Sequence, residues 1–373
     1  DDESDDECHH TAGGHPDQRR PSHGNFGYYA HAVRLANRAE GSRRWHTLYM
    51  RAIHVATTGG PEVLQPVDVP RPSPAEQDVV VRTTFAGVNY IDTYHREGRY
   101  PLDLPFIPGQ EGAGRIEDVG SNGSNWAVGD RVAWAMVSGS YAEYVRVPVG
   151  LLARIPDAVS DELAAAVMLQ GLTAHYLVTS VYPVDQTTTA VVHAAAGGVG
   201  LLLTQMLKAR GARVIGTTSS DEKVGRALAA GADHVIRYDQ EAWEERTQQL
   251  VGEKSVDVVY DGVGQATFDA GLTVLRPRGL MVLFGAASGA VPPFDLQRLN
   301  GLGSLVVTRP NLSDFVSTPD EFAWRVTELF DALSSGALSV SLAKTFRLED
   351  AAEAHRAIQS REHSGKILLS LSP

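Results

Sequence analysis

Residues 191–200 read Val191-Val192-His193-Ala194-Ala195-Ala196-Gly197-Gly198-Val199-Gly200, and this stretch decides the fold. An apolar run ends at the turn of small residues. A helix-like apolar segment follows over 201–209, and a second strand-like run follows over 212–217. This order of strand, turn, helix and strand is the context that a dinucleotide-binding fingerprint requires. Short glycine patterns also occur in turns that bind nothing, so the context carries more weight than the glycines alone.

The turn matches the fingerprint as Ala-x-Gly-x-x-Gly, because Ala195 stands in place of the first glycine. That replacement is tolerated where the residue keeps φ below zero. Gly197 would let the backbone approach a pyrophosphate, and Gly200 would let the helix pack closely on the strand. The free amides at the helix N-terminus would hold the phosphates. We therefore expect the following residues to bind the cofactor: Ala196, Gly197, Gly198, Val199 and Gly200.

The end of the second strand predicts NADPH rather than NADH. NAD enzymes usually place an Asp or Glu about 20 residues past the glycines, where it binds the ribose 2′-hydroxyl. This chain has Gly216-Thr217-Thr218-Ser219-Ser220 there, without a carboxylate to repel a 2′-phosphate. The hydroxyls of Thr218 and Ser219 would donate to that phosphate, and Lys223 lies within reach just beyond them. The alternative interpretation is that Lys223 is a solvated helix residue.

Length and composition narrow the function further. A chain of 373 residues suggests two domains, and 43% hydrophobic with 21% charged residues is ordinary for a globular protein. A net charge of −12 speaks against nucleic acid as the main partner. The single cysteine, Cys8, allows neither a disulfide framework nor a thiolate metal cluster within one chain. No apolar run approaches the roughly 18 residues of a membrane helix and no secretory signal is visible, so we expect a cytoplasmic protein.

The pattern along the chain divides it into three parts. Residues 1–49 have no hydrophobic period and are interpreted as a disordered N-terminal extension, with Met50 as the natural start and the first strand at 50–55. From 50 to 173, short strands such as 79–83 and 130–134 alternate with glycine-rich turns and few helices, which indicates an irregular β-barrel.

Residues 174–310 alternate strands and helices, which predicts an α/β fold with a doubly wound parallel sheet. The tail is expected to form helices at 318–335 and 348–360 and a strand at 366–371. The six strands of the parallel sheet are expected at 190–193, 213–217, 234–237, 256–260, 280–284 and 304–308.

Several separated stretches resemble one family in the same order. They are 86–94 (Ala-Gly-Val-Asn-Tyr-Ile-Asp-Thr-Tyr), 107–114 (Ile-Pro-Gly-Gln-Glu-Gly-Ala-Gly), the Ala-Gly-Gly-Val-Gly turn, 278–285 and 304–310. From Met50 onwards the chain resembles the medium-chain dehydrogenase/reductase superfamily, and within it the zinc-free NADPH:quinone oxidoreductases of the zeta-crystallin-like branch. The resemblance implies a GroES-like catalytic domain over 50–173 and 311–373, and a Rossmann NADPH-binding domain over 174–310.

The resemblance also predicts that no metal takes part. The zinc-dependent members of the superfamily have a Cys where Asn89 falls, a His where Gln110 stands and a further Cys near Gln170. A catalytic zinc needs at least three protein ligands and an open position, and none of these three is present here.

The remaining site residues are implied by the same resemblance. Lys223, Tyr238 and Arg361 match the group that holds the 2′-phosphate, and Phe284 falls in a matching stretch beside the cofactor. Asn89, Tyr94 and Tyr100 match the cleft where nicotinamide and quinone meet, and there they are expected to act as the catalytic residues. The alternative is that the tyrosines are surface aromatics and Asn89 is a turn residue.

The expected function is NADPH-dependent reduction of a quinone, by hydride or electron transfer, with the proton supplied by water or by Tyr94. An enal or enone double-bond reductase would share the fold, the cofactor and the missing zinc. A cofactor-sensing or RNA-binding protein is the alternative of another class, against which the acidic charge weighs.

A homodimer is expected through the last strand of the parallel sheet. Residues 304–308 are apolar, mostly β-branched and placed at a sheet edge, which invites pairing with a second copy unless the edge is covered. The resemblance points the same way.

Overall fold

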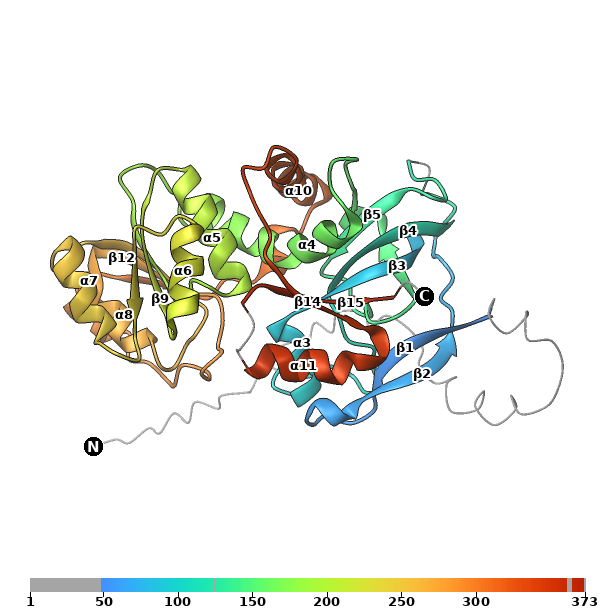
Figure 1. The fold of residues 1–373 in the computed structure, drawn as a ribbon, viewed down its shortest axis with the longest axis horizontal. Helices are drawn as coiled ribbons and strands as arrows, with labels where there is room; N and C mark the ends of the chain where they lie inside the picture. Colours follow the sequence, from blue (N-terminus) through green and yellow to red (C-terminus); the bar gives the residue numbers. More distant parts are fainter. Residues whose placement is uncertain (1–47, 124, 361–363, 372–373) are drawn as a thin grey trace, which may run out of the picture. The chain divides into compact units, whose positions relative to one another are not determined.

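The computed structural model describes residues 48–123, 125–360 and 364–371, which fold around two sheets (Figure 1). The predicted extension at 1–49 lies outside the described residues except for its last two, and so do Cys8 and Arg361. Strand β1 (Tyr49–Val55) begins one residue before the predicted start of the folded chain.

Seven strands form the first sheet, mainly through antiparallel pairs, with β14 and β15 paired in parallel. Their order is β14-β15-β3-β4-β5-β7, and β6 pairs with β3. The strands are β3 (Asp78–Val88), β4 (Glu111–Val119), β5 (Arg131–Ala135), β6 (Tyr144–Pro148), β7 (Leu152–Arg154), β14 (Leu342–Arg347) and β15 (Lys366–Ser370).

Strand β3 organises this sheet because it has three partners. β4 pairs along most of its length, whereas β6 pairs with residues 78–82 and β15 with residues 85–88. Strands β1 and β2 (Leu64–Pro70) form a separate antiparallel pair, and the 3-10 turn η1 (Pro61–Val63) lies in the connection between them. The pair joins the rest through the Ala52–Ala142 and Val55–Phe106 bridges. Short strands joined by turns are what the sequence predicted for this region.

Six parallel strands form the second sheet, in the order β10-β9-β8-β11-β12-β13. The order reverses between β8 and β11, as a doubly wound sheet requires, so this prediction is confirmed. The strands are β8 (Thr189–Val192), β9 (Arg213–Thr218), β10 (His234–Arg237), β11 (Val256–Asp261), β12 (Leu275–Leu283) and β13 (Val306–Thr308).

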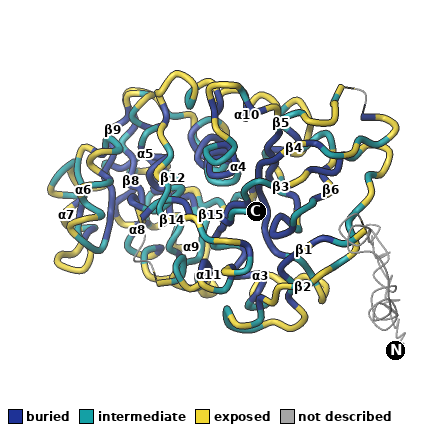
Figure 2. The backbone as a smooth tube through the Cα atoms, turned by 45° about the vertical axis from the view of Figure 1, so that its right-hand side comes forward, coloured by how far each residue is buried: buried dark blue, intermediate teal, exposed yellow. Residues whose placement is uncertain are grey.

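Alternating side chains of these strands face two helical layers. Val192 and Val214 belong to the same buried cluster as the apolar residues of α5, whereas Val191 and Ile215 belong to the cluster of α7 and α8. Burial on both faces explains the near-continuous apolar strands of the sequence and is visible in Figure 2. The helices are α5 (Gly198–Ala209), α6 (Asp221–Ala229), α7 (Trp243–Val251), α8 (Phe268–Val274) and α9 (Gln297–Gly301).

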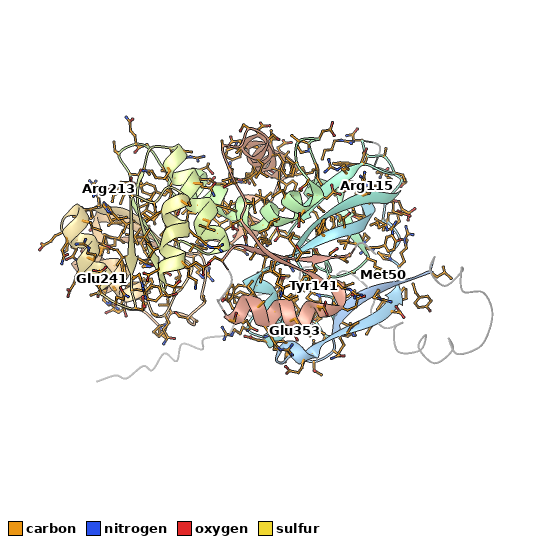
Figure 3. The ribbon with its side chains drawn as sticks, viewed as in Figure 1. Met50, Arg115, Tyr141, Arg213, Glu241 and Glu353 are labelled. Carbon is orange, nitrogen blue, oxygen red and sulfur yellow. The ribbon has the colours of Figure 1, made fainter. Side chains whose placement is uncertain are left out.

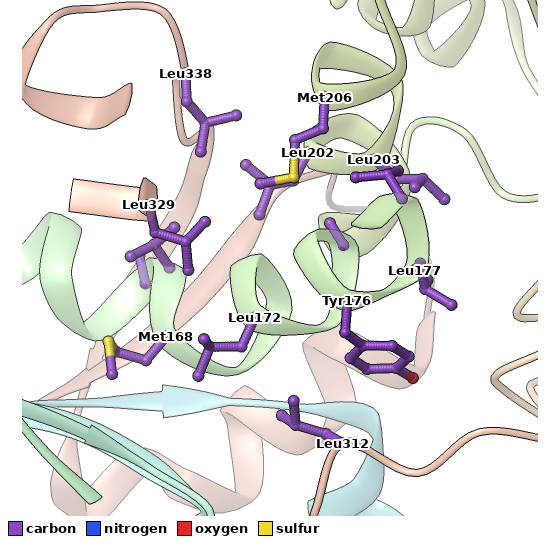
Figure 4. Close-up of a cluster of buried hydrophobic side chains, with 14 of the residues drawn as sticks. Met168, Leu172, Tyr176, Leu177, Leu202, Leu203, Met206, Leu312, Leu329 and Leu338 are labelled. Atoms are coloured by element: carbon purple, nitrogen blue, oxygen red, sulfur yellow. The ribbon is translucent and has the colours of Figure 1, made fainter. Parts of the chain in front are cut away.

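One long helix connects the two sheets. α4 (Asp161–Tyr176) begins at Ser160, whose hydroxyl accepts from the Leu163 N–H, and continues as the π-helical turn η3 (Leu177–Val181). Its buried side chains pack with those of α5 and of α10 (Pro319–Ser334) in one core (Figure 4). The domain boundary predicted at residue 173 falls inside this helix.

Several features of the fold differ from the sequence prediction. The helices α3 (Tyr90–Glu97) and α4 lie in a region for which the sequence predicted few helices. The last strand, predicted at 304–308, covers only Val306–Thr308, because Ser304 has a φ of +56° that interrupts the extended conformation. The two helices and the last strand of the tail match the prediction, with α10 capped by Thr318 and η5 (Leu348–Asp350) leading into α11 (Ala351–Ser360), but strand β14 was not predicted. The remaining turns are η2 (Val149–Leu151) and η4 (Leu312–Phe315).

Candidate cofactor and substrate site

The glycine turn lies at the point where the order of the parallel strands reverses, between the carboxyl end of β8 and the start of α5. A Cβ on Gly200 would stand 2.3 Å from the Ala194 carbonyl oxygen, so only glycine allows the helix to approach this closely. The first amides of α5 have no carbonyl one turn earlier and point out of the helix end. The turn therefore has the form of an anion site made from main chain.

The left-handed residue of the turn is Ala194, with a φ of +52°. Ala195 is not one of the described non-glycine residues that have a positive φ. It therefore meets the condition under which an alanine can replace the first glycine of the fingerprint. The positive φ therefore falls at Ala194, one residue before the first position of the fingerprint.

The predicted 2′-phosphate residues gather at the carboxyl ends of β9 and β10. The hydroxyl of Thr218 is buried and has no hydrogen-bond partner within the described part of the chain. Ser219 Oγ lies 3.5 Å from Lys223 Nζ on the first turn of α6, and the Tyr238 N–H donates to the Thr218 carbonyl. Hydroxyls and an ammonium group thus share one corner with the main chain of Tyr238, and β9 carries no carboxylate there.

Two of the predicted catalytic residues form an aromatic wall. The rings of Tyr94, from α3, and Tyr100 lie 5.3 Å apart and meet edge to face. Arg309 Nη2 donates to the Tyr100 hydroxyl (3.1 Å), and Nη1 of the same guanidinium donates to the Leu283 carbonyl at the carboxyl end of β12 (3.0 Å). Arg309 thus connects the tyrosine pair to the edge of the parallel sheet, next to Phe284, whose N–H donates to the Asp261 carbonyl.

The side chain of the third predicted catalytic residue, Asn89, is bound within a buried polar cluster. Its Nδ2 donates to Glu111 Oε1 (2.7 Å), and its Oδ1 accepts from Lys366 Nζ (2.7 Å). Lys366 also forms an ion pair with Glu111, and both side chains are almost completely buried. Glu111 Oε2 accepts from the Leu169 N–H of α4 (2.5 Å). The amide of Asn89 is therefore held by the cluster, and its role as a catalytic residue stays a prediction.

A chain of hydrogen bonds leads from Asn89 to α11. Arg96 fixes the direction of this chain, because a guanidinium only donates. Arg96 Nη1 lies 3.1 Å from His355 Nδ1, so the neutral ring carries its proton on Nε2, which lies 3.2 Å from Tyr141 Oη. Tyr141 then donates to Asp92 Oδ2 (3.1 Å), which also accepts from the Asn89 N–H (2.9 Å). Figure 3 shows Tyr141 close to α11.

Burial dominates the acid–base behaviour of this chain. Desolvation raises the pKa of Asp92 from its ordinary value of 3.8 to about 7. Desolvation and the nearby charge of Arg96 lower the pKa of His355 from 6.5 to about 3. Both groups are therefore mostly neutral near pH 6 in the folded protein. Desolvation also raises the pKa of Tyr94 to about 12, so its phenol keeps its proton at neutral pH.

The residues at the expected zinc position do not suit zinc. The amides of Asn89 and Gln110 are hydrogen-bonded, the latter to Ser138 Oγ (3.0 Å), and neither supplies an imidazole or thiolate. The Gln170 amide lies where a side chain on Gly198 would otherwise be. Throughout residues 48–123, 125–360 and 364–371, no three His, Cys, Asp or Glu side chains come together as a possible metal site.

The structure brings together Ser219 with Lys223, the main chains of Thr218 and Tyr238, and the rings of Tyr94 and Tyr100. Sequence reasoning missed Arg309, Glu111 and Lys366. Two signals were present: Glu111 is an acid within a strand of small residues, and Lys366 opens a run of aliphatic residues. Gly87 makes room for the Glu111 side chain, since a Cβ there would lie 2.3 Å from Oε1.

Two family patterns match the chain. The alcohol dehydrogenase GroES-like domain matches residues 75–157, and the zinc-binding dehydrogenase family matches residues 198–330. They correspond to the seven-stranded and the six-stranded sheet regions, so the expected pairing of a GroES-like domain with a Rossmann sheet is confirmed.

Individual relatives match most of the chain. The quinone oxidoreductase of Salmonella typhimurium is 45% identical over 315 residues, which cover 83% of this chain and 96% of that protein. The structure of Escherichia coli quinone oxidoreductase complexed with NADPH matches with a TM-score of 0.83 and 41% identity, covering 87% of this chain and 99% of that one. The 2-haloacrylate reductase of a Burkholderia species is 38% identical over 321 residues, which cover 83% and 96% of the two chains. With relatives of this similarity and coverage, the chain belongs to the quinone oxidoreductase branch of the medium-chain dehydrogenase/reductase superfamily.

Proposed function

We propose that this protein is an NADPH:quinone oxidoreductase. The observation that carries the proposal is the carboxyl edge of the parallel sheet. A glycine turn and a hydroxyl-rich corner with no acid on β9 lie there, and Arg309 links a tyrosine pair to the same edge. NADPH supplies the reducing electrons when it is bound; the protein aligns the two reactants and excludes water.

Several residues support binding of the 2′-phosphate. The unpartnered Thr218 hydroxyl, Ser219, Lys223 and Tyr238 meet at one corner, where an NAD enzyme would have a carboxylate. The Ser364 carbonyl accepts from Arg226 Nη1 (2.8 Å), so the chain shortly after Arg361 lies against α6, the helix that carries Lys223. This supports Arg361 as a further phosphate contact.

The tyrosine pair suits a flat, electron-poor ring. Tyr94 and Tyr100 offer aromatic faces with hydroxyl groups, and Arg309 places a positive charge beside them. A cation there would stabilise the negative charge that develops on a quinone oxygen. The raised pKa of Tyr94 makes its phenol a weaker acid than usual, which favours water as the proton source.

The second candidate function is reduction of an electron-poor carbon–carbon double bond. It is favoured by the similarity to 2-haloacrylate reductase. Both functions use the same cofactor corner, so the substrate decides between them.

The decisive experiment measures NADPH oxidation with a panel of quinones and enones, and with NADH for comparison. We expect the highest kcat/KM for quinones with NADPH; a preference for enones would favour the second function. Lys223→Ala should reduce kcat/KM for NADPH about 10- to 100-fold and leave NADH turnover unchanged, as expected for one charge-assisted contact. An unchanged preference in this variant would refute the phosphate assignment.

We further propose a homodimer through β13. This strand pairs with β12 on one side, and within the described residues no strand covers its other side, where Val306 is 51% exposed. Pairing of two such edges around a two-fold axis would join two sheets into one. Light scattering should give twice the chain mass of 40.1 kDa, and Val306→Pro should reduce it to one chain, because proline cannot donate to the ladder. A wild-type mass of one chain would contradict the dimer.

We place the protein in the cytoplasm, without a nucleic-acid partner. Among the described residues, one helix, Asp161–Val181, is long and apolar enough to cross a membrane. It is α4 with η3, and 67% of its apolar window is buried inside the fold, so we assign it to the core. The net charge of −12 argues against a nucleic-acid partner.

A further inference from the structure

An exposed apolar loop begins at the tyrosine pair. Residues 100–105 read Tyr-Pro-Leu-Asp-Leu-Pro, and we call them the apolar loop. Leu102 is 38% exposed and Leu104 is 45% exposed, and Asp103 is the one charged residue of the loop. Two exposed leucines this close together in a short loop suggest a surface that contacts an apolar partner.

The exposure of these leucines does not come from a loose chain end. At the start of the loop, the N–H groups of Arg99 and Tyr100 both donate to the Tyr94 carbonyl (2.9 and 3.3 Å). At its end, Phe106 and Val55 exchange two main-chain hydrogen bonds (2.9 and 3.1 Å). Prolines at 101 and 105 restrict φ between these anchors. The loop is therefore held in place with its leucines in solvent.

The position of the loop connects it to the substrate site. Tyr94 is buried and Tyr100 is 39% exposed, so the aromatic wall runs from the interior to the surface. Arg309 binds Tyr100 and the Leu283 carbonyl at the sheet edge where the cofactor is expected. The apolar loop continues from the outer tyrosine, so Leu102 and Leu104 follow Tyr100 by two and four residues.

We propose that Leu102 and Leu104 bind the alkyl or prenyl substituent of a quinone whose ring lies against Tyr94 and Tyr100. This proposal rests on the proposed function and narrows its substrate class to quinones with an apolar tail. A ring alone is small enough to be covered by the tyrosines. A substituent attached to that ring is the group that reaches from the wall to the adjoining leucines and removes them from water.

A series of benzoquinones with the same ring and 6-alkyl chains of one to ten carbons tests this. A fully buried methylene improves binding about fourfold, and contact on one side about twofold. We expect kcat/KM to rise about twofold per carbon, about thirtyfold between methyl and hexyl, and then to level off. The gain should lie in KM rather than kcat, since the tail contacts ground state and transition state alike.

The double variant Leu102→Asp/Leu104→Asp should abolish this dependence on chain length. The measured quantity is the ratio of kcat/KM for the hexyl and methyl quinones within each variant, so a general loss of activity does not affect it. Val128→Asp is the matched control, because Val128 is a 68% exposed aliphatic residue in a different loop. This variant should keep the wild-type ratio.

The outcomes separate this inference from the proposed function. If wild type reduces the methyl quinone with NADPH but the ratio is near one, the tail site is wrong and the function stands. If no quinone is reduced, the function itself fails. If the ratio is near one and phosphatidylcholine vesicles bind wild type but not the double variant, the loop docks on membranes and the proposal is overturned.

Discussion

The glycine turn and the buried polar cluster handle polar groups in opposite ways. The turn is built from main chain and small residues, and the first amides of α5 have no partner within the helix. The polar cluster consists of side chains that bind one another: Asn89, Asp92, Arg96, Glu111, Tyr141, His355 and Lys366. The first region depends on the small size of its residues. The second depends on hydrogen bonds and an ion pair between side chains, so substitutions should harm the two regions for different reasons.

The largest effect is expected where pairing is broken. Lys366→Met leaves the Glu111 carboxylate buried without its cation, which should lower the free energy of unfolding by about 3–5 kcal/mol in urea denaturation. Lys344→Met, on the neighbouring exposed strand β14, should change it by less than about 0.5 kcal/mol. The double variant Glu111→Gln/Lys366→Met should recover part of the loss. Equal denaturation midpoints for Lys366→Met and wild type would contradict the claim that the substitution leaves Glu111 as a buried charge without a partner.

An open polar group should behave differently. Thr218→Val removes a buried hydroxyl that has no partner in the described structure, so the cofactor-free protein should be at least as stable as wild type. If that hydroxyl binds the 2′-phosphate, NADPH affinity should fall by about 1.5–3 kcal/mol, about 10- to 100-fold, with NADH affinity unchanged. Titration calorimetry with both cofactors measures this. A parallel loss for both cofactors would remove Thr218 from the phosphate site.

Added atoms should matter more than lost bonds in the turn. Gly200→Ala places a Cβ against the Ala194 carbonyl, and the overpacking should cost about 1–3 kcal/mol of stability and weaken NADPH binding. Gly225→Ala is the matched control, because it lies within α6 with no atom within 4 Å of its Cβ position. It should stabilise the protein by up to about 1 kcal/mol in thermal unfolding. Equal stability of the two variants would contradict the close-approach role of Gly200.

Within the polar cluster, Asp92 and His355 should have opposite pH dependences. Between pH 4 and 6.5, the unfolded chain protonates His355 and ionises Asp92, whereas the folded protein holds both neutral. His355 alone makes stability fall as pH drops from 6.5 toward 3. Asp92 alone makes stability fall as pH rises from 3.8 toward 7.

In wild type these two contributions oppose each other. Asp92→Asn should therefore lose about 1.4 kcal/mol more than wild type per unit of acidification, and His355→Gln the same per unit of alkalinisation. Urea unfolding at pH 5 and pH 6 measures both slopes. Curves parallel to wild type would mean that neither group changes its proton on folding.

The parallel sheet was predictable because its signals are local. Strand β10 occupies the predicted residues, and each other strand lies within two residues of its prediction except β12, which begins five residues earlier. The helix α3 was missed because Asp92, Thr93 and Arg96 are buried in it, so its sequence lacks an apolar period. The polar cluster joins residues up to 277 positions apart, as in the Lys366–Asn89 contact, and no pattern along the chain records such pairs. The predicted strand 304–308 is longer than β13 because the strand propensity of a sequence does not reveal the positive φ of Ser304.

The two hydrogen bonds of Arg309 link the separation between Tyr100 and the parallel sheet to a contact that can be followed in solution. The guanidinium of Arg309 donates one hydrogen bond to the Leu283 carbonyl of the parallel sheet and another to the hydroxyl of Tyr100. A larger distance between the Leu283 carbonyl and the Tyr100 hydroxyl must break one of the two hydrogen bonds. The phenol ring of Tyr100 is the end that can carry a spectroscopic label. A single fluorine on the ring of residue 100 would therefore report opening and closing in solution, without a change to either reactant.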